Sequence, residues 1–112
     1  MATMGSSLSS HAVLILASLA DQPRHGYAVK RDVTERTGGD VALGSTTLYR
    51  LLGLLLDEGL IEETRTRPSP ALDDERRRYY AITASGRRAL AAELRRLERV
   101  LVAARARPSR AR

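Results

Sequence analysis

The strongest constraint on the fold lies between Gly44 and Ile61, where the sequence carries the signals of one complete helix. A hydroxyl of Ser45 or Thr46 can cap its start by accepting a backbone N–H. Gly59 supplies the left-handed residue that ends a helix, and the period then changes toward that of a strand. Four leucines recur at helical spacing and predict a buried face: Leu48, Leu51, Leu52 and Leu55.

The outer face of this predicted helix carries small hydroxyls, a phenol and an arginine. Such side chains near a helix N-terminus suit contact with phosphates and with base edges in a DNA major groove. The candidate contact residues are Ser45, Thr46, Thr47, Tyr49 and Arg50. An ordinary core helix with a polar front would show the same pattern, so the neighbouring segments must decide between the two interpretations.

The core that this helix faces must be small and aliphatic. The chain has 112 residues, enough for one domain, with four Tyr, no Phe and no Trp. So small a core gains from sharing apolar surface with a second copy. Cysteine is absent, which excludes disulfides and thiolate metal sites. No phosphate loop or metal-ligand spacing is present, so we expect no cofactor, no metal and no catalytic site.

The positive charge is concentrated in the second half of the chain. The net charge is +6, and residues 1–59 carry five bases and six acids, whereas residues 60–112 carry 14 bases and seven acids. This distribution favours an anionic partner such as DNA. The longest apolar run, Ala12 to Ala20, is too short to span a bilayer and does not follow a basic segment. We therefore expect a cytoplasmic protein with no membrane partner.

Two further helices are predicted before the central one. The first runs from Leu8 to Asp21, with Ser9 or Ser10 as its cap, and is apolar nearly all round, which places it at the centre of the fold. The second runs from about Gly26 to Thr37, and Val41–Leu43 then fits a minimal strand. Three helices in this order match a helix-turn-helix core.

A basic hairpin is predicted after the central helix. Its strands run from Leu60 to Arg67 and from Arg76 to Thr83, around a loop that contains prolines. The arginines near its tip are Arg65, Arg67, Arg76, Arg77 and Arg78. A basic hairpin directly after a helix-turn-helix occupies the place of the wing in a winged helix, which follows the phosphate backbone. The alternative is a solvated arginine-rich hairpin without a partner.

The last predicted helix runs from Ala84 to about Arg105 and is capped by Thr83. Its leucines have the spacing of a coiled-coil seam: Leu90, Leu94, Leu97 and Leu101. A winged-helix core is already closed without this stripe, so we expect it to join two copies in a two-fold dimer. The alternative is that the helix folds back on its own core.

These elements predict a mainly α fold with a small β-wing. The winged helix-turn-helix domain would span residues 1–83, with residues 1–7 disordered. A C-terminal dimerisation helix would span residues 84–105, and residues 106–112 would form a disordered basic tail.

The ordered motifs resemble the PadR family of bacterial transcriptional regulators, in its short form with a single C-terminal helix. The matching motifs are Ile15–Leu19, His25–Tyr27, Thr47–Leu52, Glu58–Ile61, Arg78–Thr83 and Gly86–Leu90. The resemblance implies a homodimeric winged helix that represses transcription from an inverted-repeat operator in double-stranded DNA, often with release by a small-molecule effector. It also makes Tyr49 similar to the family's recognition-helix tyrosine. A winged-helix protein-interaction module without specific DNA binding is the alternative function.

Some positions depart from the family pattern. Ser45-Thr46 stand where the family often has Pro-Gly, and Gly53-Leu54 stand where many members have basic residues. Arg50 is therefore the only base on the predicted recognition helix, so the hairpin must supply much of the phosphate contact. Of the His25–Tyr27 motif, we expect a structural hydrogen bond from His25, a close approach at Gly26 and a packing role for Tyr27.

Overall fold

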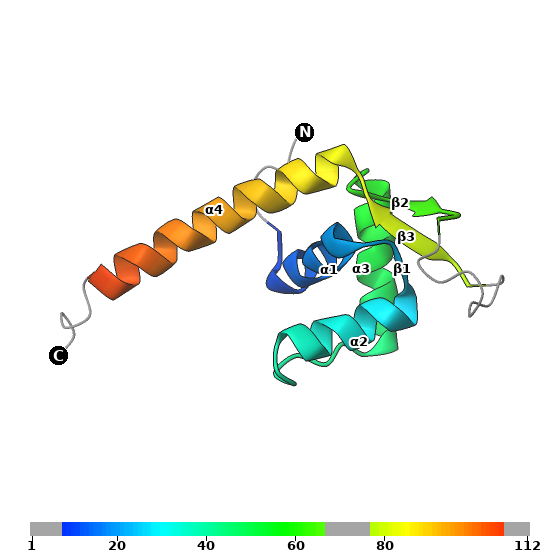
Figure 1. Cartoon of the computed structure of the whole chain (residues 1–112), viewed down its shortest axis with the longest axis horizontal. Coiled ribbons are helices and arrows are strands. Elements are labelled where there is room, and N and C mark those ends of the chain that lie inside the picture. Colours follow the sequence, from blue (N-terminus) through cyan, green and yellow to red (C-terminus); the bar gives the residue numbers. More distant parts are fainter. Residues whose placement is uncertain (1–7, 67–76, 107–112) are drawn as a thin grey trace.

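The computed structural model describes residues 8–66 and 77–106. In this part of the chain, helices and a small antiparallel sheet form a winged helix-turn-helix body, from which the last helix projects (Figure 1). The helices are α1 (Ser10–Asp21), α2 (Gly26–Arg36), α3 (Ser45–Asp57) and α4 (Ala84–Ala106). The strands are β1 (Arg24–His25), β2 (Ile61–Thr64) and β3 (Tyr79–Ile82), in the sheet order β1-β3-β2.

Helix α1 lies at the centre of the body, as predicted. The side chains of Ile15, Leu16 and Leu19 are at most 1% exposed. The hydroxyl of Ser9 caps the helix by accepting the backbone N–H of Ala12 at 3.1 Å. Among the helices of the described ranges, α1 included, none has the length and apolar content needed to cross a lipid bilayer.

Helix α3 buries the predicted leucine face, because its buried residues are Leu48, Leu51, Leu52 and Leu55. The predicted cap is wrong: the helix is preceded by Gly44 in extended backbone, and no side chain caps it. Ser45 and Thr46 therefore belong to the first turn, where their side chains are exposed. Gly59 follows the helix with φ at 75°, as predicted for a left-handed terminator.

The sheet differs from the prediction in one strand. Val41–Leu43 does not form a strand, because the N–H of Val41 bonds locally to the hydroxyl of Thr37 at 3.0 Å. The third strand is instead β1, which pairs antiparallel with β3 so that His25 lies opposite Tyr79. The predicted hairpin forms between β2 and β3, which are shorter than expected. The predicted strand ends at Arg67 and Arg76 lie outside the described residues.

The start of α4 is fixed to the end of α3. The hydroxyl of Thr83 accepts the N–H of Gly86 at 3.0 Å and donates to the carbonyl of Gly59 at 2.7 Å, so Thr83 caps the helix as predicted. A Cβ atom on Gly86 would lie 2.0 Å from the carbonyl oxygen of Leu60, which leaves no room for a side chain. Leu90 packs into the core one turn later, and the rest of α4 extends beyond the body (Figure 1).

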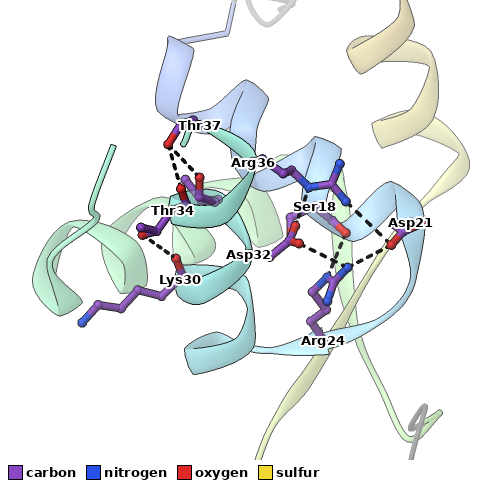
Figure 2. Close-up of polar contacts among 9 residues, drawn as sticks. Ser18, Asp21, Arg24, Lys30, Asp32, Thr34, Arg36 and Thr37 are labelled. Atoms are coloured by element: carbon purple, nitrogen blue, oxygen red, sulfur yellow. Dashed lines mark hydrogen bonds and ion pairs between the residues drawn. The ribbon is translucent and has the colours of Figure 1, made fainter. Parts of the chain in front are cut away.

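A polar network joins α1 to α2 (Figure 2). The guanidinium of Arg24 donates to the carbonyl of Ser18 at 3.1 Å and to the carboxylate of Asp21 at 3.0 Å, and it lies 3.6 Å from Asp32. Arg36, one turn after Asp32, pairs with it at 2.5 Å. The side chains of Arg24 and Asp32 are 14% and 15% exposed, so the network fixes the angle between the two helices from a largely buried position.

The charges of this network act on Asp32. Burial opposes its ionisation, but the hydrogen bond from Arg36 and the charges of Arg24 and Arg36 outweigh burial and lower the pKa of Asp32. A carboxylate whose pKa is lowered by folding stabilises the fold at every pH above the pKa that it has in the unfolded chain, near 3.9. It loses that contribution as the pH falls through the lower pKa that it has in the folded chain.

Replacing Asp32→Asn tests this contribution. We expect the free energy of unfolding at pH 7 to fall by about 1–2 kcal/mol, because a hydrogen bond between charged groups is lost in a partly exposed pair. The difference from the wild type should shrink as the pH falls to about 2.5. Urea denaturation at both pH values measures it. Asp21→Asn is the control, since Asp21 is 61% exposed, and an equal loss in that variant would contradict the assignment.

Candidate nucleic-acid interface

The first turns of α3 present the predicted contact residues to solvent. The side chains of Ser45, Thr46, Tyr49 and Arg50 are exposed, and Thr47 is half-buried. Their direction follows from burial of the leucine face, because the outer face of a helix is opposite its buried stripe. The hydroxyls of Ser45 and Thr46 make no cap, and both side chains are exposed.

Tyr49 lies over the start of α2. A Cβ atom built on Gly26 would be 2.3 Å from the hydroxyl oxygen of Tyr49, so only glycine allows this approach. The predicted close approach at Gly26 is confirmed, and Tyr49 is the neighbour that requires it. The ring is 53% exposed, which leaves one side of it on the molecular surface.

A cavity of about 470 Å³ lies where α2, α3 and the hairpin meet. We call it the notch, and its lining residues are His25, Gly26, Tyr27, Tyr49, Arg77, Arg78 and Tyr80. Two arginines and several hydroxyls therefore face one concave surface beside the exposed turn of α3. Such a surface can accept an anion, because guanidinium groups donate charge-assisted hydrogen bonds.

His25 connects the notch to the backbone of α2. Its Nδ1 atom accepts the N–H of Ala28 at 3.1 Å and so caps the helix, which confirms the expected structural hydrogen bond. The other ring nitrogen, Nε2, lies 2.7 Å from the guanidinium of Arg77. The imidazole and this guanidinium therefore lie against each other on one side of the notch.

The other side of the notch is formed by the hairpin. Arg78 lies 3.4 Å from the carboxylate of Glu63 in an exposed ion pair, and Arg65 is exposed after β2. Burial raises the pKa of the Tyr80 hydroxyl, and Glu63 and Tyr49 raise it further, whereas Arg78 acts in the opposite direction. Tyr80 is therefore a neutral hydroxyl at physiological pH.

The structure divides the predicted contact residues into two groups. Tyr49, Arg77 and Arg78 line the notch. Arg50 lines a separate cleft on the other side of α3, toward the start of α1. Arg67 and Arg76 lie outside the described residues, so their predicted role stays a prediction.

The predicted dimerisation stripe is also divided. Leu90 is 7% exposed and belongs to the core of its own chain, so it is not available to a partner. Leu94, Leu97 and Leu101 are 42–47% exposed, and Val100 and Val102 are exposed beside them. The prediction was wrong for Leu90 because the first turns of α4 pack against the body before the helix leaves it.

Some notch residues were not predicted as contacts. His25 and Tyr27 belong to a motif that we interpreted as structural, and Tyr80 follows the hairpin arginines in sequence. Tyr27 is 54% exposed rather than packed, with its ring parallel to that of His25 and the Arg31 guanidinium 5.9 Å from its centre. In the sequence, these residues are indicated by the aromatic pair that flanks Gly26. That the pair lines the notch depends on β1, which places it against the hairpin.

Gly26→Ala should displace the Tyr49 ring from the notch, because the added methyl occupies the place of its hydroxyl. We expect a loss of about 1 kcal/mol in unfolding free energy and a changed Tyr49 environment, seen in the aromatic NMR spectrum. Gly53→Ala is the control, since its Cβ meets no atom within 4 Å, and it should stabilise α3 by about 0.5–1 kcal/mol. An unshifted Tyr49 ring in Gly26→Ala would contradict the packing.

Comparison with known proteins gives one family. The model of the transcriptional regulator PadR-like family matches residues 15–92, whereas no curated protein sequence matches the chain significantly. A transcriptional regulator from Clostridium thermocellum superposes with a TM-score of 0.70 at 21% identity, over 88% of this chain and 92% of that one. A PadR-like transcriptional regulator from Bacillus cereus superposes with a TM-score of 0.71 at 24% identity, over 85% of this chain and 87% of that one. Bacillus subtilis PadR, in complex with operator DNA, superposes with a TM-score of 0.62 at 25% identity, over 75% of this chain and 46% of that one.

Proposed function

The chain belongs to the PadR-like family of transcriptional regulators, and we propose that it is a homodimeric repressor that binds an inverted-repeat operator in double-stranded DNA. Members of this family are regulators and not enzymes. The DNA contacts proposed here come from the exposed turn of α3 and from the notch. The repressor role and the cytoplasmic location are inferred from the likeness to PadR regulators, of which the Bacillus subtilis protein was solved with operator DNA.

The observation that carries the proposal is the position of the notch beside the outer face of α3. When the first turn of a recognition helix enters a major groove, the flanking phosphates lie next to that turn. The notch offers the guanidinium of Arg77, which lies against His25, to one such phosphate. A phosphate oxygen accepts charge-assisted hydrogen bonds from this guanidinium. This arrangement fits a backbone contact that fixes the register of α3.

The dimer follows from the part of α4 that leaves the body. Its exposed leucines Leu94, Leu97 and Leu101 have the spacing of a helix seam, and the described residues of the same chain do not bury them. Two copies joined along this seam by a two-fold axis would direct both α3 helices to one face of a duplex. Half-sites one helical turn apart, about 34 Å, would then receive one helix each.

Arg77→Ala tests the phosphate contact. We expect weaker binding to every DNA sequence and a salt dependence whose slope is smaller by about 1, because one phosphate contact per copy is lost. Fluorescence anisotropy on DNA from upstream of the protein's own gene, at several salt concentrations, measures both quantities. Arg99→Ala is the matched control, since Arg99 is an exposed arginine on α4, away from the notch.

If Arg77→Ala and Arg99→Ala bind DNA with the same affinity and the same salt dependence, the assignment of the notch as a phosphate-binding site is contradicted. If the wild type binds no DNA even at low salt, the alternative of a protein-interaction module is preferred.

Leu97→Glu tests the dimer seam. A buried carboxylate in each copy should cost about 2 kcal/mol per side chain, so the dimer dissociation constant should rise roughly a thousandfold. Size-exclusion chromatography with light scattering at micromolar concentration measures the mass. Ala103→Glu, at an exposed position on the opposite face of α4, should remain dimeric. A wild type that is already monomeric under these conditions would refute the proposal.

A further inference from the structure

The DNA-binding proposal gives no role to Gly53, although this residue lies in the interior of α3, the helix that carries the contact residues. A glycine inside a helix lowers its stability relative to alanine, because the glycine backbone loses more conformational freedom on folding. Gly53 also stands at one of the positions where the chain departs from the PadR pattern. Either the fold or a partner must therefore account for this glycine.

The fold does not require a glycine at position 53. Gly53 is not among the described glycines that have a positive φ, so its backbone is accessible to any residue. A Cβ atom would collide with a neighbour at Gly26 and at Gly86, but a Cβ atom on Gly53 meets no atom within 4 Å. Alanine would therefore fit, and no contact within residues 8–66 and 77–106 accounts for the glycine.

Gly53 lies on the outer face of α3. It follows Thr46 by seven residues and Arg50 by three, so helical spacing places all three on one face, opposite the buried leucines. The missing side chain leaves a space on this face, between Tyr49 and Arg50 of the preceding turn and Asp57 of the next. We call this space the α3 gap. In the proposed complex it is directed toward the major groove.

The chemistry around the α3 gap favours an apolar group of the DNA. The peptide groups of Gly53 take part in the hydrogen bonds of the helix, so the residue presents only its CH₂ group. Leu54 beside it is apolar and 49% exposed. Asp57, one turn later, is exposed and would repel a phosphate. The apolar group that base edges present in the major groove is the C5-methyl group of thymine.

We propose that the α3 gap receives the C5-methyl group of one thymine in each operator half-site, which makes Gly53 a specificity-determining residue. The methyl group would occupy the place where a Cβ atom would stand, and α3 could then approach the base edges closely. This inference rests on the proposed DNA-binding function and adds to it one base that the protein reads.

The test removes single methyl groups from the DNA. The probe is the footprinted DNA from upstream of the protein's own gene, in which each thymidine is replaced in turn by deoxyuridine, which lacks only the C5-methyl group. Fluorescence anisotropy measures the affinity of the full-length protein for each fragment. At one thymine in each half-site, we expect the replacement to weaken binding by the wild type about fourfold, because a methyl group is then no longer buried.

Gly53→Ala adds the corresponding methyl group to the protein. We expect this variant to bind the thymine operator about tenfold more weakly than the wild type, because two methyl groups compete for one space. It should bind the deoxyuridine operator more tightly than the thymine operator, so the effect of the DNA methyl group changes sign. Urea denaturation should show the variant to be folded and at least as stable as the wild type, which separates this effect from misfolding.

Gly44→Ala is the matched control. It adds a methyl group at another glycine whose Cβ meets no atom within 4 Å, before the start of α3, and it should keep the wild-type preference for thymine at the identified position. If no replacement weakens wild-type binding, or if Gly53→Ala retains that preference, the inference is overturned. Equal losses of affinity by Gly53→Ala for both operators would also overturn it. A wild type that binds no DNA at low salt would refute the proposed function, and the inference with it.

Discussion

Burial of the leucine face of α3 determines most of what this molecule presents to its surroundings. Leu48 and Leu52 are each 1% exposed, and they pack in one core cluster with residues of α1, α2 and the sheet. With this face held inward, helical geometry directs Thr46 and Arg50 outward, and the exposed Tyr49 lies to the side, over Gly26. Rotating α3 by even one residue would expose leucines and bury Arg50 without a partner, which the small aliphatic core could not tolerate.

Short local contacts then decide where the other elements lie relative to that face. The cap of α2 by His25 and the pairing of β1 with β3 bring the start of α2 against the hairpin, and the notch is the space that remains. At the other end of α3, the hydroxyl of Thr83, which caps α4, donates a hydrogen bond to the carbonyl of Gly59, the residue that terminates α3. Gly86 lets the start of α4 approach Leu60 closely. The direction in which α4 leaves the body is therefore set by the same segment that ends α3. In the proposed dimer, this link would determine how far apart the two α3 helices lie.

Much of this architecture can be predicted from local patterns. The four helices, the burial of the α3 leucines, Ser9 and Thr83 as caps, and Gly59 as a terminator each depend on residues within a few positions of one another. Two errors are local: the predicted cap of α3, which is preceded by Gly44, and the predicted strand at Val41–Leu43, where the N–H of Val41 bonds to the hydroxyl of Thr37 four residues earlier. The other errors involve contacts between distant segments, because no local signal shows that Arg24–His25 would pair with β3. Leu90 fits the coiled-coil spacing, yet it is buried because α4 crosses the core before it projects. The notch likewise combines residues from segments far apart in the chain.

The central claim is that two copies direct the start of α3 at one face of a duplex. Because the chain contains no cysteine, a single Ala42→Cys variant can carry an iron-chelate cleavage reagent at an exposed position just before α3. On a DNA fragment that the protein binds, we expect two clusters of backbone cleavage about 10 base pairs apart, and no cleavage when the reagent is on Ala103→Cys of α4. A single cluster from Ala42→Cys, or stronger cleavage from Ala103→Cys, would contradict this arrangement.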